Sequence, residues 1–444
     1  MGATATREDV STPRAQRDLG RERFRVSTVA ALRVALLLLV VTNVGRIPLD
    51  LGAREAPFMV NDIAALMVLA VGGLAMLQAR SMLLTDTALA AILFATLGAL
   101  SAFAAIPRFG LTTPELIASL AYLARWVVYF LMYIVVVNCL RARDAMSVWR
   151  ALETAMLIFA AFGVFQAMFL PNFGLMVYPE ARPYLDIDPQ GQRLVSTVLE
   201  PNIAAAMICL TLLVQVALLS SGVAMPTWKP ALMFFALLLT ISRSGAFAFV
   251  IGLFVILATR GLRKKVLKLA TLAAVIVLAT VPLVWDFVQT HGRLGISDNS
   301  AYGRVIMWGR AVATFLEHPW FGIGFNTYGF VQERRGFERV GGASYSVEGG
   351  LLFVAVMTGI VGLAVFSYMM WCAIRRCPAI WRHPAATPEQ RGLAVGTAAA
   401  TVAICVHSVF VNSLMVPFVM EPLWVLWGLC FLIAMSLRAQ ARGS

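Results

Sequence analysis

The chain has 444 residues, of which 60% are hydrophobic and 13% are charged, and its mean hydropathy is +0.81. This composition excludes a soluble globular protein and indicates a polytopic membrane protein. The net charge of +13 does not indicate nucleic-acid binding, because the basic residues are scattered among short loops. All six cysteines fall in apolar segments or on the side expected to be cytoplasmic, so we expect no disulfide.

The N-terminal segment 1–26 has mixed charge and is rich in arginine, and no small-residue cleavage site follows the first apolar run. We therefore expect a disordered cytoplasmic tail rather than a signal peptide. Twelve apolar runs of about 20 residues follow and predict an all-α membrane protein with about 12 transmembrane helices. The runs are 28–45, 58–78, 84–106, 115–140, 148–170, 201–221, 229–242, 244–260, 265–284, 348–371, 392–413 and 418–437.

The stretch 229–260 is too long for one span, and SRSG at 242–245 interrupts it. We assign it to two helices, although one long kinked helix also fits. Spans one to nine then occupy 27–284 with a smaller outer loop at 171–200. A large outer loop fills 285–348, and spans ten to twelve and a short C-terminus fill 349–444.

The positive-inside rule gives the orientation of the chain. With the N-terminus inside, roughly 22 of the 36 Lys and Arg residues, including every lysine, lie on the cytoplasmic side. Both termini are then cytoplasmic and both long loops are periplasmic. The chain shows no internal repeat, and its longest loop is not the central cytoplasmic loop that a transporter of two six-helix halves would have.

The arginines predicted on the outer side oppose this charge bias. A planar guanidinium suits phosphate and carboxylate better than a lysine ammonium does, so these arginines indicate recognition of an anion. Ion pairs with loop carboxylates account for part of them equally well. The large loop holds six: Arg293, Arg304, Arg310, Arg334, Arg335 and Arg339.

Two polar motifs precede apolar runs on the outer side. In RLVSTVLEPN, the residues Glu200, Pro201 and Asn202 are typical of a helix start, and Arg193 stands just before them. Helix capping alone explains this stretch. In ISRSG, Arg243 lies in apolar sequence, where a charge needs a partner or a water-filled cavity. The helix start at that point suits an anion, and snorkelling to the interface is the alternative.

A third motif in the large loop combines Arg304 and Trp308, which stand four residues apart and so share one helical face. The indole suits stacking on a sugar ring, or anchoring at the membrane interface. The turn-forming segment HPWFGIGF follows.

The candidate general base is Glu348, directly before the apolar helix GGLLFVAVMTGIVGL. The helix dipole also favours a carboxylate there, so a purely structural role is an alternative. Asp62 and Glu421 are competing carboxylates, and His407 is interpreted as a hydrogen-bonded interior residue. We see no metal-ligand spacing and no nucleotide-binding motif, so no metal or cofactor is expected.

Taken together, RLVSTVLEPN, the SRSG break, Arg304 with Trp308 ahead of HPWFGIGF, and TGIVGL resemble the O-antigen ligase and O-antigen polymerase superfamily over roughly residues 190–370. The resemblance implies a metal-independent, inverting membrane glycosyltransferase of the bacterial inner membrane. It would take a glycan from an undecaprenyl-diphosphate carrier at the periplasmic face. The implied diphosphate-binding residues are Arg243, Arg304 and Arg193, and the candidate sugar-positioning residues are Trp308, Asn202 and Arg310.

One position departs from the ligase pattern. Ligases of the family typically have a His-Asn or His-Ser pair fourteen residues before the second glycine of a turn that here contains Gly359 and Gly362, and that position is Glu348. Some polysaccharide polymerases resemble this chain in having a carboxylate there. We therefore predict polymerisation of lipid-linked repeats of a surface polysaccharide or exopolysaccharide. The alternatives are a ligase acting on lipid A core or protein, and a flippase or transporter of an anionic lipid-linked substrate.

Overall fold

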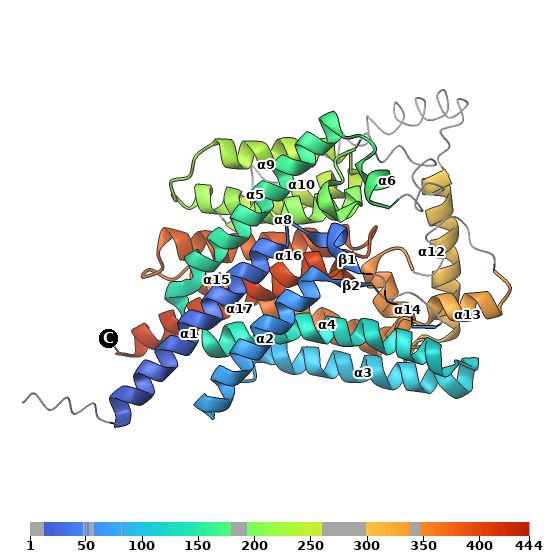
Figure 1. Ribbon diagram of the computed structural model, residues 1–444, viewed down its shortest axis with the longest axis horizontal. Coiled ribbons are helices and arrows are strands. Elements are labelled where there is room, and N and C mark those ends of the chain that lie inside the picture. Colours follow the sequence, from blue (N-terminus) through green and yellow to red (C-terminus); the bar gives the residue numbers. More distant parts are fainter. Residues whose placement is uncertain are drawn as a thin grey trace, which may run out of the picture.

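The computed structural model describes residues 13–47, 49, 51–52, 57–80, 82–178, 193–259, 299–337 and 347–443, with side chains from Glu22 onward in the first helix and from Met307 onward in α12 (Figure 1). These parts are helical apart from turns and one antiparallel pair of short strands. The strands are β1 (Arg46–Ile47) and β2 (Phe58–Met59). The protein is therefore an all-α protein with helices that can cross a membrane.

The long helices follow the predicted apolar runs closely. They are α1 (Pro13–Leu38), α2 (Val60–Ala79), α3 (Asp86–Phe109), α4 (Thr113–Cys139), α5 (Ala145–Phe169), α8 (Pro201–Ser220), α9 (Trp228–Leu239), α10 (Arg243–Thr259), α14 (Gly350–Ile374), α16 (Pro388–His407) and α17 (Pro417–Gly443). Short helices connect them: η1 (Thr42–Gly45), η2 (Ala142–Asp144), α6 (Phe173–Val177), η5 (Ser196–Val198), α13 (Tyr328–Arg334), α15 (Cys377–Trp381) and η7 (Ser413–Met415). A further long helix, α12 (Asn299–Glu317), lies within the predicted large outer loop.

Eleven of the twelve predicted runs thus contain a helix, and the ninth, 265–284, lies outside the described residues. Seven described helices are long and apolar enough to span a membrane, and α9 and α10 are shorter apolar helices. The twelve-span count stays a prediction. The SRSG segment does separate two helices, because α9 ends at Leu239 and α10 begins at Arg243.

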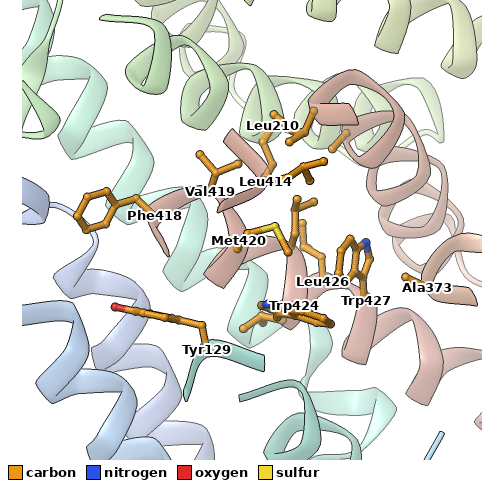
Figure 2. Packing of buried hydrophobic residues seen from close by; sticks show 14 of the residues in the cluster. Tyr129, Leu210, Ala373, Leu414, Phe418, Val419, Met420, Trp424, Leu426 and Trp427 are labelled. Atoms are coloured by element: carbon orange, nitrogen blue, oxygen red, sulfur yellow. The ribbon is translucent and has the colours of Figure 1, made fainter. Parts of the chain in front are cut away.

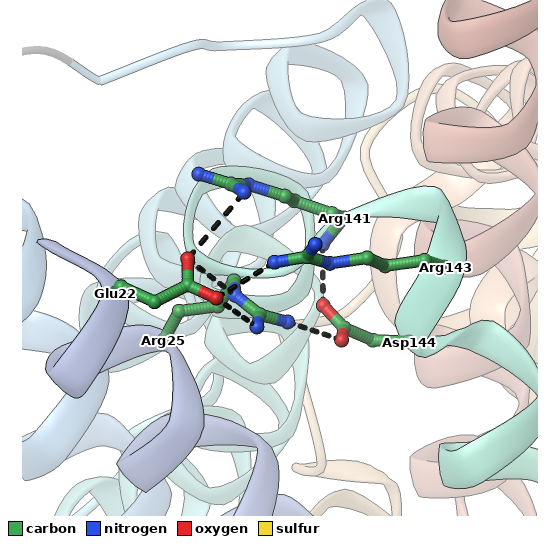
Figure 3. Close-up of polar contacts among 5 residues, drawn as sticks. All are labelled: Glu22, Arg25, Arg141, Arg143 and Asp144. Carbon is green, nitrogen blue, oxygen red and sulfur yellow. Dashed lines mark hydrogen bonds and ion pairs between the residues drawn. The ribbon is translucent and has the colours of Figure 1, made fainter. Parts of the chain in front are cut away.

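The first helix begins earlier than the sequence predicts. Residues 13–26 are helical, whereas we expect a disordered tail over 1–26. Arginine and glutamate favour helix, and the described side chains of Glu22 and Arg25 find partners across the bundle. Arg25 binds both Glu22 and Asp144, and Glu22 also pairs with Arg143 (2.7 Å) and Arg141 (3.4 Å) (Figure 3). Its hydrogen bond with Arg25 lowers the pKa of Glu22.

The centre of the bundle is formed by α17 and α8. In the most apolar stretch of each helix, 89% of the α17 residues and 83% of the α8 residues are buried, against 33% in α2 and in α3. Trp424 and Trp427 of α17 pack edge to face, and Tyr129 of α4 lies nearby (Figure 2). The outer helices α2 and α3 therefore leave apolar side chains exposed, as lipid-facing helices do.

α12 stands across the ends of the long helices, with α13, β1 and β2 on the same side of the molecule (Figure 1, right). We call this side the α12 end. The helix α14 reaches it with a break: Gly359 has φ 69° and ψ −170°. The break removes backbone hydrogen bonds within α14, and the turn at 318–324 replaces them with bonds of 2.7–3.3 Å between N and O. The turn donates from Ile323 N to Val356 O and from Gly324 N to Met357 O, and α14 donates from Ile360 N to Pro319 O and from Val361 N to Trp320 O.

A side chain at Gly359 should disrupt this junction. A Cβ there would lie 2.1 Å from the carbonyl oxygen of Trp320, and the backbone conformation is one that only glycine adopts readily. We expect Gly359→Ala to destabilise the protein by at least about 1–3 kcal/mol from the backbone alone. Gly73→Ala is the matched control, because nothing lies within 4 Å of its Cβ. Thermal unfolding in detergent checks both, and equal melting temperatures would contradict this account of the break.

Candidate functional site

The start of α10 is organised around the turn 240–242. Arg243 is the first residue of the helix and is exposed, and no described residue accepts a hydrogen bond or ion pair from its side chain. A cation at a helix N-terminus gains nothing from the helix dipole, whereas a bound anion would be favoured there. The start of α10 thus presents an exposed guanidinium where a bound anion would be stabilised.

Arg193 lies against the same turn. Its Nε donates to the carbonyl oxygen of Thr240 at 2.8 Å, and an Nη donates to that of Ile241 at 3.4 Å. These carbonyls follow the C-terminus of α9, where a cation is favourable. Arg193 thus supports the segment that presents Arg243, and at least part of its guanidinium group is hydrogen-bonded to backbone carbonyls.

The predicted helix start at Glu200 to Asn202 is confirmed. Glu200 is the N-cap of α8 and accepts from the Ile203 N–H, and Pro201 occupies the first turn. Asn202 donates to Glu200 at 2.8 Å and accepts from the Ser242 hydroxyl at 2.8 Å. Burial raises the pKa of Glu200, and the hydrogen bonds from Ile203 and Asn202 oppose that shift. Asn202 therefore joins the α8 start to the turn before Arg243.

Glu348 is held rigidly at the start of α14. Its carbonyl oxygen accepts a hydrogen bond from the Trp308 indole at 3.0 Å. The N–H of Gly350 and that of Leu351 donate to carbonyls of the segment 408–411, at 3.3 and 3.4 Å. These bonds satisfy helix N–H groups that would otherwise have no partner. The carboxylate therefore projects from a backbone anchored on both sides.

Gly349 makes this arrangement possible. Its φ is +95°, and a Cβ there would lie 2.5 Å from the carbonyl oxygen of Val409. The segment 408–412 can pack against the α14 start only because position 349 lacks a side chain. The sequence shows Gly349 as an ordinary neighbour of Glu348, and nothing in it indicates the partner.

α12 places the predicted aromatic residue beside Glu348. The Trp308 ring also packs on Phe410, with 6.1 Å between the ring centroids. Arg304 stands one helical turn earlier on the same face of α12, and its side chain lies outside the described side chains. Arg310 faces elsewhere, with its guanidinium 4.5 Å from the centre of the Phe337 ring. Arg310 is thus not brought to Glu348.

His407 connects the two groups of residues. It is fully buried, as expected of a hydrogen-bonded interior residue, and this prediction is confirmed. Its Nε2 lies 3.2 Å from the Ser244 hydroxyl, and its Nδ1 is bonded to the Ser413 hydroxyl. Ser244 in turn lies 3.1 Å from Ser242. The residue after Arg243 is therefore linked to the segment that seats Glu348.

The competing carboxylates have other surroundings. Asp62 accepts from Tyr129 at 3.0 Å and from the Met59 N–H at 2.9 Å, and it pairs with Arg125 at 3.1 Å. Both of its oxygens are engaged in a structural network. Glu421 is completely buried within the bundle. Of the three carboxylates, Glu348 is thus the only one that is not buried.

A cavity of about 360 Å³ borders Glu200, and no residue of the turn at 240–242 lines it. Its walls include Tyr122 and Trp126 of α4 and the segment 415–418 before and at the start of α17. The sequence does not predict this cavity, because its walls come from apolar stretches far apart in the chain. It is large enough for a small polar group with an apolar face, since ligand pockets begin at roughly 300 Å³.

Comparison with known proteins identifies one matching segment of the chain. Residues 231–367 match the family model described as O-antigen ligase. A search of curated proteins finds no match to the chain. The matched segment contains Arg243, Arg304, Trp308, Glu348 and the α14 break at Gly359. The predicted resemblance to the O-antigen ligase and O-antigen polymerase superfamily is thereby confirmed over residues 231–367.

Proposed function

We propose that the protein is a glycosyltransferase that polymerises undecaprenyl-diphosphate-linked oligosaccharide repeats at the periplasmic face of the inner membrane. One observation carries the proposal. Glu348 is anchored between Trp308 and the segment 408–411, and the same segment is linked through His407 to the motif that presents Arg243. A candidate base and a candidate diphosphate ligand thus belong to one connected structure.

In this proposal the α12 end faces the periplasm. The support is the charge bias of the sequence, which puts every lysine on the opposite side. Arginines at the α12 end then serve to recognise anions rather than to orient the chain. Both termini lie in the cytoplasm.

The reaction needs no group beyond these side chains. The acceptor hydroxyl oxygen attacks the anomeric carbon of the donor, and the bond from that carbon to the diphosphate oxygen breaks with inversion. The electron pair leaves on the diphosphate, whose growing charge Arg243 and Arg304 stabilise, and Arg193 holds the Arg243 segment. Glu348 takes the acceptor proton. Trp308 and Asn202 position the reacting groups, and Arg310 acts further from the centre.

A second candidate is the ligase reaction, in which the finished glycan passes to lipid A core or to a protein. The family description of residues 231–367 favours it, because that description names a ligase. The carboxylate at position 348 favours polymerisation, because ligases of the family have histidine there. The same arginines would hold the donor diphosphate in both reactions.

The decisive experiment gives the purified protein a synthetic carrier-linked repeat, with and without a lipid A core acceptor. Carrier-linked chains of two or more repeats, formed without core, support the polymerase. Glycan attached to the core, with no longer carrier-linked chains, supports the ligase. Neither product in a folded preparation would contradict both.

A further inference from the structure

The strongest unassigned feature is a chain of buried and partly buried hydrogen bonds that joins several helices of the bundle. It runs through side chains of α8, the turn at 240–242, α10, α16 and η7. All of its members are described, and the residues in order are Glu200, Asn202, Ser242, Ser244, His407 and Ser413.

His407 is the only titratable ring in that chain, and the proposed reaction does not use it. It is the last residue of α16 and has no exposed surface. Each ring nitrogen meets a serine hydroxyl, which can donate or accept, so a neutral imidazole is satisfied in either tautomer. A buried polar network that is fully satisfied fixes one geometry.

The two partners of His407 belong to different parts of the candidate site. Ser244 follows Arg243 at the start of α10. Ser413 directly follows the segment 408–412. Carbonyls of that segment accept hydrogen bonds from the N–H groups at the start of α14, beside Glu348. The imidazole is therefore a rigid spacer between the arginine and the carboxylate.

We propose that His407 is a positioning residue that sets the distance between the diphosphate-binding start of α10 and the base at the start of α14. This inference rests on the proposed function and adds a residue to it. His407 touches no substrate. A displacement of about 1 Å between reacting groups can cost roughly 100-fold in rate, so a spacer of this kind has a large effect without chemistry of its own.

The test compares three substitutions of His407 with a matched control. His407→Phe keeps the ring and loses both hydrogen bonds. His407→Gln places an amide near the former Nε2, toward Ser244, and His407→Asn places one near the former Nδ1, toward Ser413. The control is Trp427→Phe, which loses one buried hydrogen bond, from α17 to Thr401 of the same helix α16 as His407 but two turns away from it.

We expect His407→Phe to lower kcat/KM for glycan transfer by about 10- to 100-fold. The Gln and Asn variants should each recover part of that loss, whereas Trp427→Phe should transfer at the wild-type rate. All four proteins should show similar melting temperatures. If His407→Phe and Trp427→Phe transfer equally well, the inference is wrong.

A double-mutant cycle separates positioning from mere support of the fold. In a Glu348→Ala background there is no base to position, so His407→Phe should cost little further in kcat at saturating donor. A purely structural role would give the same loss in both backgrounds, and that result would overturn the inference.

A binding measurement keeps this inference distinct from the proposed function. Undecaprenyl diphosphate is titrated into the protein in nanodiscs, where His407→Phe should bind about tenfold more weakly than wild type. If wild type binds the carrier but transfers nothing, the proposed reaction fails, and weaker binding by His407→Phe then supports only the part of the role that orders the start of α10. If wild type transfers glycan and His407→Phe binds and transfers as the control does, only the positioning role fails.

Discussion

Replacing Glu348 by alanine should reduce glycan transfer by about 10²- to 10⁴-fold, the usual contribution of a general base. The substitution keeps the contacts with Trp308 and the segment 408–411, because the backbone makes them. We therefore expect folded protein in the membrane, no polymer, and an accumulation of lipid-linked single repeats. Extraction of carrier-linked glycans, with their separation by length, measures this.

Two further substitutions sharpen the test of the base. Glu348→Gln keeps the shape and removes the basicity, so it should be as defective as Glu348→Ala. Glu348→His introduces the side chain typical of the ligases that this chain resembles and should retain part of the transfer, because imidazole is also a base. Glu333→Ala is the control, since Glu333 is an exposed carboxylate on α13. Wild-type polymer from Glu348→Ala would remove the base from the mechanism.

The helical bundle is largely predictable because, in a membrane protein, the apolar composition of each segment alone determines whether it forms a helix. An apolar run of sufficient length must be helical in lipid, whatever its neighbours are, so eleven runs became helices. The N-terminal segment does not follow this rule. Residues 13–26 look like a soluble tail until Asp144, more than a hundred residues later, is seen to bind Arg25.

The α14 break shows the same limit. In the sequence GIVGL reads as part of an apolar helix, and HPWFGIGF reads as a turn. Each segment supplies the hydrogen bonds that the other lacks, and a propensity argument on either one alone does not reveal this. Such complementary pairing is a tertiary property. The glycines in the sequence therefore indicate an irregular backbone in each segment but do not show that the two segments pair with each other.

The candidate site was predictable where the chemistry was unusual for its surroundings. Arg243 was singled out because a charge in apolar sequence is costly, and Glu348 because a carboxylate preceded a long apolar helix. His407 and the segment 408–412 were not assigned to the site, because an ordinary interior histidine and a short loop give no local signal. Their importance comes only from what they touch.

Replacing Arg243 separates ligand binding from stability. The side chain is exposed and begins α10 without an acceptor among the described residues, so Arg243→Ala should change the melting temperature little. Its loss should nevertheless lower kcat/KM by about 10²- to 10³-fold, which is typical when one preorganised donor to a developing negative charge is removed.

Arg243→Lys tests whether the site needs two parallel hydrogen bonds from a guanidinium or only a positive charge. Lysine keeps the charge but cannot donate two parallel hydrogen bonds to a phosphate, so we expect a loss of about tenfold or more relative to arginine. Arg335→Lys is the control, because that arginine also lies at the α12 end but pairs with Glu317 at 2.6 Å. Steady-state transfer with increasing carrier-linked donor measures both. Equal rates for Arg243→Lys and wild type would mean that a positive charge alone suffices and that the bidentate diphosphate contact is wrong. An equal loss of rate in Arg335→Lys would instead assign the effect to the summed positive charge of the α12 end.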